Sequence, residues 1–144
     1  GDVFAGIEDL EGSALADTLS GNATANALRG GGGNDVLNGQ AGNDTLEGGA
    51  GDDTLSGGTG SDALFGGEGL DVVSYATLTT GFRFDLGQPA LMTGEAALDL
   101  RDGIEGVIGG AGADTLAGDG GANLLTGGAG NDALDGREGA DRLD

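Results

Sequence analysis

Residues 30–74 read GGGGNDVLN, GQAGNDTLE, GGAGDDTLS, GGTGSDALF and GGEGLDVVS, which are five blocks of nine residues without a gap. We number the positions of each block one to nine from its first glycine. Glycine recurs at positions one and four, and an aliphatic residue recurs at position eight. Position six is always acidic: Asp35, Asp44, Asp53, Asp62 and Asp71. A fixed short period of this kind is typical of a solenoid, in which each block stacks on others.

The register continues in both directions from this stretch. Upstream, GSALADTLS begins at Gly12 and GNATANALR at Gly21, and their position-six residues are Asp17 and Asn26. Downstream, a second series of four blocks begins at Gly109, and its position-six residues are Asp114, Asn123, Asp132 and Asp141. We predict one solenoid module over residues 1–144, with a first array at 3–74, a non-repeat insert at 75–102 and a second array at 103–144.

The composition limits what kind of core and partner the chain can have. Its 144 residues include 35 Gly, only 3 % aromatics and no Cys or His, and the formal net charge is −20. Such a chain repels nucleic acid and attracts cations, and it has no apolar run long enough to insert into a membrane. An acidic, glycine-rich composition is also compatible with disorder. Disorder, however, does not require an aliphatic residue at every ninth position.

Each block divides into a turn and a short strand. Glycine at positions one, two and four permits positive φ, and the x-Leu-x triplet alternates as a strand does. Two blocks make one coil, with their aliphatic residues facing each other inside. Successive coils stack about 4.8 Å apart, so position six lies over position six two blocks later. One edge then contains Asp17, Asp35, Asp53 and Asp71, and the other contains Asn26, Asp44 and Asp62.

These stacked carboxylates require cations between them. Two carboxylates about 4.8 Å apart repel by roughly 3.5 kcal/mol at an effective dielectric of 20. Several such contacts exceed the typical 5–15 kcal/mol net stability of a domain. Glycine-rich turns also expose backbone carbonyls, and carboxylate plus carbonyl oxygens are calcium ligands. Magnesium fits less well, because it demands tight octahedral geometry and keeps its water.

The blocks resemble the GGxGxDxUx repeats of the RTX (hemolysin-type calcium-binding) family over roughly residues 6–74 and 103–144. The resemblance implies an all-β fold, a right-handed parallel β-roll, here as two roll segments joined by a wider coil. It also implies that each calcium ion lies between turns two blocks apart. The ligands are then both position-six carboxylates, the carbonyls of positions two and four of the first turn, and those of positions one and three of the second.

Carried over residue by residue, the resemblance implies four complete sites. They are Asp35 and Asp53 with the carbonyls of Gly31, Gly33, Gly48 and Ala50; Asp53 and Asp71 with Gly49, Gly51, Gly66 and Glu68; Asp44 and Asp62 with Gln40, Gly42, Gly57 and Thr59; and Asp114 and Asp132 with Gly110, Gly112, Gly127 and Ala129. Asp17 and Asp141 are further metal ligands by position, and we expect about five to seven calcium ions.

Three turns depart from the repeat pattern. Ser13 and Leu15 replace the glycines of the turn that holds Asp17, which makes the pair of Asp17 and Asp35 a less complete site. Asn26 and Asn123 each offer one neutral oxygen in place of a carboxylate. Sites that need these two residues are therefore expected to be weak or empty.

The insert has a different pattern from the arrays. Residues 72–75 and 82–86 are predicted to be strands, and residues 88–97 are predicted to be a loop. We interpret Tyr75, Phe82 and Phe84 as the filling of a wider coil between the two arrays. The alternative is a partner- or glycan-binding face, with Arg83 and Arg101 as cationic contacts.

The resemblance implies a secreted, extracellular calcium-binding module that passes a type I secretion channel unfolded and folds outside the cell. Its role would be structural and secretion-assisting, and its partners would be calcium and further domains of a longer parent chain. Catalysis is not expected, because without His, Cys or Lys most nucleophile–base pairs are missing. The alternative is a glycan- or surface-binding module of an adhesin, a surface-layer protein or a polysaccharide-modifying enzyme, with a polysaccharide or cell surface as partner.

Overall fold

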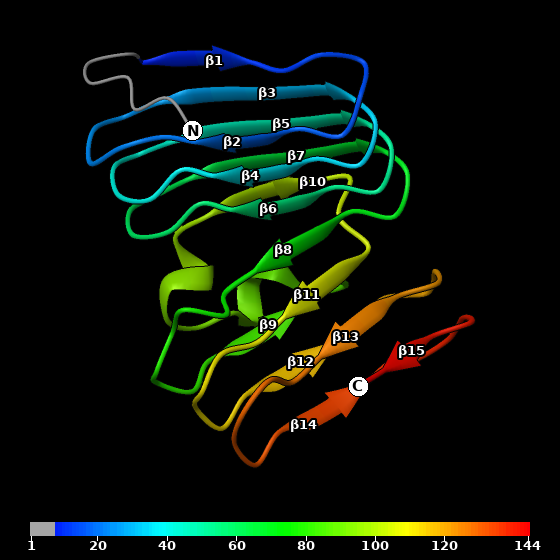
Figure 1. Ribbon diagram of the computed structural model, residues 1–144. Helices are drawn as coiled ribbons and strands as arrows, with labels where there is room; N and C mark the ends of the chain where they lie inside the picture. Colours follow the sequence, from blue (N-terminus) through cyan, green and yellow to red (C-terminus); the bar gives the residue numbers. More distant parts are fainter. Residues whose placement is uncertain (1–7) are drawn as a thin grey trace.

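The computed structural model describes residues 8–144, which form a solenoid of short parallel strands (Figure 1). Residues 3–7, the beginning of the predicted first array, lie outside the described residues. In the first array the strands are β1 Asp9–Glu11, β2 Thr18–Ser20, β3 Ala27–Gly32, β4 Val36–Asn38, β5 Thr45–Ala50, β6 Thr54–Ser56, β7 Ala63–Glu68 and β8 Val72–Ser74. Each repeat strand begins at position seven of its block, as predicted.

The insert contributes two strands and two short 3-10 turns, and the second array contributes five strands. The insert elements are β9 Arg83–Asp85, η1 Pro89–Leu91, η2 Glu95–Ala97 and β10 Leu100–Asp102. The later strands are β11 Gly106–Ile108, β12 Thr115–Ala117, β13 Leu124–Thr126, β14 Ala133–Asp135 and β15 Arg142–Leu143. The predicted strand over 82–86 is thus shorter, and the predicted loop over 88–97 contains the two 3-10 turns.

The pairing register confirms that two blocks make one coil. Leu46 of β5 lies beside Leu28 of β3 on one side and Leu64 of β7 on the other, so neighbouring strands are two blocks apart in sequence. All the strand pairs are parallel. Side chains of the same block position therefore form straight rows along the roll, which is what places the position-six residues over one another.

One sheet runs through both arrays, whereas the opposite side of the roll is interrupted. The continuous sheet has seven strands in the order β15-β13-β11-β8-β6-β4-β2. The opposite side consists of a five-stranded sheet, β1-β3-β5-β7-β10, and a three-stranded sheet, β14-β12-β9. After β8 the chain moves forward to pair β9 with β12, and it then returns to pair β10 with β7. The two roll segments are therefore joined without a break along one face.

The core of the first array is a double row of aliphatic side chains. Leu10 and Leu19, the first two position-eight residues, are partly buried, and the following ones are completely buried: Leu28, Leu37, Leu46, Leu55, Leu64 and Val73. A buried Leu or Val stabilises a fold by about 1.5–3 kcal/mol through removal of apolar surface from water. Each coil contributes only two such residues, so the core is as thin as the composition suggested.

The insert widens this core with aromatic side chains. Tyr75, Phe82 and Phe84 are all buried, and the rings of Phe82 and Phe84 lie 5.2 Å and 5.8 Å from that of Tyr75. This confirms that they fill the wider coil. Arg101 is not an exposed cationic contact, because it lies over the Phe84 ring and donates hydrogen bonds to the Tyr75 hydroxyl and the Ala96 carbonyl.

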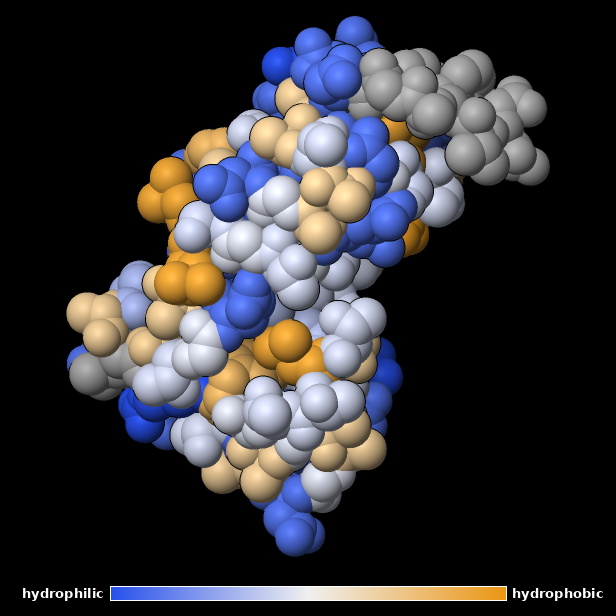
Figure 2. Space-filling model, turned by 90° about the vertical axis from the view of Figure 1, so that its left-hand side faces the viewer, coloured by the Kyte–Doolittle hydropathy of each residue, from blue (hydrophilic) through white to orange (hydrophobic). Residues whose placement is uncertain are grey.

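Hydrophobic and hydrophilic residues are unevenly distributed over the surface. On the face shown in Figure 2, hydrophobic residues gather near the narrowed middle of the molecule, and the two ends are mainly hydrophilic. Within residues 8–144 there is no helix long and apolar enough to span a bilayer.

Candidate metal sites on the edges of the roll

Two rows of position-six side chains line the edges of the sheets, immediately before the strands. The row beside the seven-stranded sheet contains Asp17, Asp35, Asp53, Asp71, Glu105, Asn123 and Asp141. The other side has Asn26, Asp44, Asp62 and Asp99 beside the five-stranded sheet, and Asp114 and Asp132 beside the three-stranded one. The structure thus brings together every predicted position-six residue with its neighbour 18 residues away.

Glu105 and Asp99 belong to these rows although the repeat pattern did not reveal them. Each directly precedes a three-residue strand, β11 and β10 respectively, as position six does in a repeat block. An acid followed by a short strand is the sequence signal that identifies them. We call two turns that follow each other along one edge a step.

We call these rows of position-six side chains ladders. In each acidic ladder residue, a backbone N–H donates a hydrogen bond to one carboxylate oxygen. The Oδ1 atom of Asp53 accepts a hydrogen bond of 2.8 Å from the Asp35 N–H, and Asp71 Oδ1 accepts one of 2.8 Å from the Asp53 N–H. On the opposite edge, Asp62 Oδ1 accepts one of 2.8 Å from the Asp44 N–H. These bonds orient the side chains, so the other oxygen, Oδ2, points into the turn.

That second oxygen is buried and has no hydrogen-bond partner in five residues: Asp35, Asp44, Asp53, Asp62 and Asp71. These side chains are at most 2 % exposed. A buried carboxylate without a partner is strongly unfavourable. Burial accordingly raises the pKa of Asp71 to about 6, and it also raises the pKa values of Asp44, Asp53 and Asp62. Each of these oxygens therefore needs a cation or a proton.

A backbone carbonyl of the next coil lies beside the unpartnered oxygen of Asp35, Asp44, Asp53 and Asp71. A Cβ placed on Gly30 would overlap Asp35 Oδ2 and lie 2.6 Å from the Gly48 carbonyl oxygen. A Cβ on Gly48 would meet Asp53 Oδ2 and the Gly66 carbonyl in the same way. Position one must be glycine because the two oxygens converge on the space that a side chain would fill. Gly39 has the same surroundings, formed by Asp44 and the Gly57 carbonyl.

The carbonyls of positions two and four point along the roll towards the next coil. Their oxygens would collide with a Cβ on the glycine one coil later, which occurs for Gly31, Gly33, Gln40, Gly42, Gly49, Gly51, Gly110 and Gly112. The position-three carbonyls of Ala50, Thr59 and Glu68 accept hydrogen bonds of 2.8–2.9 Å from the position-four N–H groups one coil earlier. In the second array, the Ala129 N–H donates to the Gly110 carbonyl.

The turns fall into two classes that differ at position two. In what we call open turns, which begin at Gly30, Gly39, Gly48, Gly57 and Gly66, position two has positive φ and the position-six Oδ2 has no partner. In closed turns the position-two N–H donates to the position-six side chain instead. The closed turns are Ser13 to Asp17, Asn22 to Asn26, Gly110 to Asp114 and Asp119 to Asn123, at 2.7–2.9 Å.

The closed turns lie at the start of each array. Asp114 consequently has hydrogen-bond partners on both carboxylate oxygens, whereas both bonds from Ser13 fall on the Oδ2 atom of Asp17. The two last turns have positive φ at Gly128 and Arg137, and their Asp132 and Asp141 are only partly buried. The predicted set of metal residues thus divides into a well-formed centre and two modified ends.

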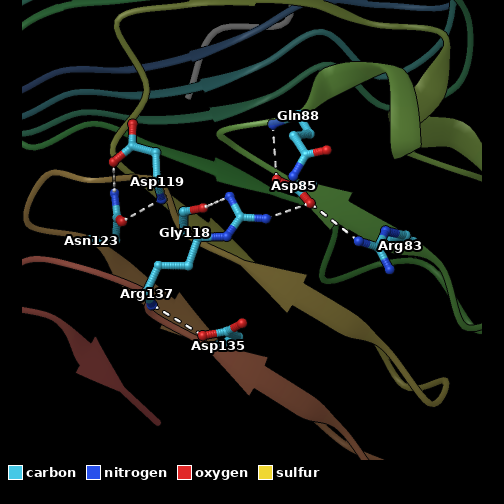
Figure 3. Close-up of polar contacts among 8 residues, drawn as sticks. All are labelled: Arg83, Asp85, Gln88, Gly118, Asp119, Asn123, Asp135 and Arg137. Carbon is cyan, nitrogen blue, oxygen red and sulfur yellow. Dashed lines mark hydrogen bonds and ion pairs between the residues drawn. The ribbon is translucent and has the colours of Figure 1, made fainter.

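Two position-two side chains supply nitrogen donors where the turns hold Asn. Figure 3 shows that Arg137 reaches the Gly118 carbonyl and also bonds Asp85 Oδ2 at 2.7 Å. Burial opposes ionisation of Asp85, but the hydrogen bond and charge of Arg137 outweigh it and lower the pKa of Asp85. In the first array, Gln40 Nε2 bonds the equivalent Gly21 carbonyl at 2.6 Å. These carbonyls therefore have protein donors.

The oxygen ligands of the open steps are those that bind a hard cation. Nowhere within residues 8–144 do three or more His, Cys, Asp or Glu side chains gather around one point. Each open step instead offers two position-six carboxylates, one oxygen of which is unpartnered, and backbone carbonyls. Oxygen ligands of mixed carboxylate and carbonyl type fit calcium, so the donors fit the ion that the sequence pattern implied.

A family model of known proteins matches the chain. The family model described as RTX calcium-binding nonapeptide repeat (4 copies) matches residues 11–46, 38–73 and 108–143, which together exceed half of the chain. The matched ranges include the open and the closed turns and leave out the insert. No curated protein matches the chain.

Proposed function

Because the chain belongs to the RTX calcium-binding nonapeptide repeat family, we propose that it is a structural module of a secreted protein that folds when calcium binds outside the cell. One observation carries the proposal. Five buried carboxylates each keep an oxygen without a partner in the first array. Without cations the stacked coils would bury these charges uncompensated, so the fold needs the ions.

The ions would occupy the three open steps between repeat blocks. Asp35 and Asp53 form one step, Asp53 and Asp71 form the second, and Asp44 and Asp62 form the third, each with the carbonyls described above. Calcium supplies positive charge and ligand positions for these oxygens. We expect weaker binding at Asp17 and at Asp114, because in each case the position-two N–H of the turn already bonds the Oδ2 atom.

The energetics support folding outside the cell. Extracellular calcium modules bind with dissociation constants of about 10⁻⁴–10⁻³ M. A site filled to ten times its dissociation constant stabilises the folded state by about 1.4 kcal/mol. Three such sites contribute roughly 4 kcal/mol, which is most of the stability of a marginal domain. At low cytoplasmic calcium the chain would stay unfolded, which suits export through a type I channel.

We assign the module no catalytic role. The sequence has no His, Cys or Lys, and its buried acids are used in the ladders. In the insert, Asp85 accepts a hydrogen bond from Arg137 and Asp99 accepts one from Tyr75, so both carboxylates serve as structural contacts.

The test is a calcium titration of the whole chain followed by far-ultraviolet circular dichroism. We expect an unfolded spectrum in chelator, a cooperative gain of β structure at millimolar calcium, and little gain with magnesium at the same concentration. Isothermal titration calorimetry that starts from the calcium-free chain counts the ions bound on folding. The same β content in chelator as in calcium would refute the proposal.

A further inference from the structure

Two of the five unpartnered carboxylate oxygens lie at the end of the first array. Asp62 and Asp71 belong to its last two turns, and each keeps an unpartnered oxygen. The strands of the next coil are β10, from the insert, and β11, from the start of the second array, so no residue 18 positions later supplies a second carboxylate. The question is which groups of this coil lie opposite Asp62 Oδ2 and Asp71 Oδ2.

Glu105 occupies the position-six place in the coil after Asp71. Val72 pairs with Gly106 in the parallel register, so Glu105 stands next to Asp71 in the ladder. The Asp71 N–H donates to Glu105 Oε2 at 3.0 Å, as the Asp53 N–H does to the Asp71 carboxylate. The Asp71 carbonyl accepts bonds of 2.9 Å from the N–H groups of Glu105 and Gly106. The row of position-six carboxylates thus continues from Asp71 to Glu105, at the start of the second array.

Gly103 supplies the carbonyl that position one provides in a regular turn. A Cβ on Gly66 would overlap the Gly103 carbonyl oxygen and lie 2.5 Å from Asp71 Oδ2. This is the arrangement found at Gly48, where Asp53 Oδ2 and the Gly66 carbonyl converge. Asp71 itself is 0 % exposed, so its unpartnered oxygen cannot be satisfied by bulk water.

The turn on the repeat side has the open conformation. Gly67 has φ of 118° and Gly69 has φ of 140°, close to the values of 114° and 127° at Gly49 and Gly51 in the preceding turn of this edge. The carbonyls of positions two and four are therefore available here as they are one coil earlier. The ligand types of an open step are therefore all present. Asp71 and the carbonyls of Gly67 and Gly69 come from the first array, and Glu105 and the carbonyl of Gly103 come from the start of the second array.

We propose that Asp71, Glu105 and the carbonyl of Gly103 bind a calcium ion at the junction between the first and the second array, together with the carbonyls of Gly67 and Gly69. The proposal rests on the proposed function and adds a site that the repeat pattern does not contain. Because Glu105 leads directly into β11, this ion ties the first array to the strand that continues the seven-stranded sheet into the second array.

The corresponding step on the other edge does not offer the same ligands. Asp99 accepts the Asp62 N–H at 3.1 Å with Oδ1, and its Oδ2 accepts the Tyr75 hydroxyl at 2.7 Å. Arg101 lies 3.9 Å from the same Oδ2 and also bonds the Ala96 carbonyl. Both oxygens of Asp99 thus have partners, and a buried guanidinium supplies the positive charge. One junction ion is therefore expected, at Glu105.

A pocket lies on the side of the junction that Glu105 occupies. Asp102, Gly103, Glu105 and Asp119 contribute to the lining of this pocket, whose volume is about 410 Å³.

The test compares the calcium stoichiometry of the whole chain with those of Glu105→Gln and of Asp102→Asn, measured by isothermal titration calorimetry. Asp102 is exposed and lies three residues from Glu105, so its variant removes one charge nearby but no ladder oxygen. We expect Glu105→Gln to bind one calcium ion fewer than the wild type, and Asp102→Asn to bind the same number. Glu105→Asp, which restores the usual position-six residue, should also retain the ion. Equal stoichiometry of Glu105→Gln and wild type would overturn the junction site.

A second measurement decides the matter if Glu105→Gln does not fold. The wild type labelled with ¹³C at the glutamate side-chain carboxyl is titrated with calcium, and the Glu105 resonance is identified by its absence from Glu105→Asp. Its chemical shift should change until calcium saturates the chain, whereas an unmoved resonance would overturn the site. A wild type that binds no calcium contradicts the proposed function as a whole. A wild type that binds calcium without involving Glu105 contradicts only the junction.

Discussion

The open turns in the middle of the first array and the closed turns at the start of each array use nearly the same residues in different ways. In both classes position one is glycine, and in the open turns and the closed turn of Asp114 the position-six Oδ1 accepts a backbone N–H from the coil before it. The difference lies in one backbone group. In a closed turn the position-two N–H satisfies the second position-six oxygen or its amide equivalent, whereas in an open turn position two is left-handed and Oδ2 stays unpartnered.

The position-two N–H separates the two classes: it bonds the position-six side chain in a closed turn, whereas in an open turn Oδ2 stays without a partner. The closed turns at the start of the first array suit the end of a stack, where solenoids need capping units. If the open turns bind cations as proposed, the centre of the first array depends on cations, and the experiments below test that division.

The largest effect is expected from Asp53→Asn. Asp53 belongs to two open steps, with Asp35 and with Asp71, so its loss weakens two sites at once. An Asn keeps the Oδ1 acceptor for the Asp35 N–H. We expect the stoichiometry to fall by up to two ions, and the free energy of unfolding at ten times the dissociation constant to fall by about 3 kcal/mol. Calorimetry and urea unfolding in calcium measure the two quantities.

Asp52→Asn is the matched control for that variant. Asp52 is the exposed position-five neighbour, and its Oδ1 accepts the Leu70 N–H at 3.0 Å. Asn34 and Asn43 do the same at their turns, so Asn is already a native solution at this position. The control should bind as many ions as the wild type. If Asp52→Asn and Asp53→Asn lose the same number of calcium ions, the loss of one negative charge, and not the loss of a ladder ligand, would explain the effect.

The sequence predicted the centre of this molecule well, because there the repeat alone determines the structure. The strand positions, the two-block coil and the buried row from Leu28 to Val73 follow from spacing. So does the stacking of position-six residues. Each depends only on neighbours that obey the same pattern.

The ends and the insert were less predictable, because their neighbours do not obey the pattern. The block GGAGADTLA has every consensus glycine, yet Gly110 closes its turn onto Asp114. The coil before it belongs to the insert, and the Leu78 carbonyl lies where a Cβ of Gly110 would be. Glu105 was missed because its block lacks glycine at positions one and two, although it lies nine residues before Asp114; its place opposite Asp71 comes from the path of the chain and not from the nine-residue spacing.

A smaller effect, in the opposite direction, is expected from opening a closed turn. The double variant Ser13→Gly and Leu15→Gly removes the hydroxyl that bonds Asp17 Oδ2 at 2.8 Å, and it restores glycine at positions two and four. Asp17 and Asp35 should then form an additional open step. We expect one more calcium ion, worth about 1.4 kcal/mol at ten times its dissociation constant.

The single variant Leu15→Gly serves as the control, since it leaves the Ser13 N–H and hydroxyl on Asp17. Calorimetric stoichiometry distinguishes the two. If the double variant gains no ion, position two is not what closes the turn.

The smallest effect concerns the calcium-free chain and pH. Burial raises the pKa of Asp71 to about 6 and also raises the pKa values of Asp44, Asp53 and Asp62, so the folded state holds protons more tightly than the unfolded state. Stability of the calcium-free fold must then fall as pH rises from about 4 through 6. Protein depleted of calcium by dialysis should show more β structure by circular dichroism at pH 5 than at pH 7.5, because a proton partly replaces the cation on each open turn. Asp85 acts in the reverse direction, since Arg137 lowers its pKa and its contribution is lost only at still lower pH. A calcium-free chain that gains structure between pH 5 and pH 7.5 would show that the open carboxylates do not control folding.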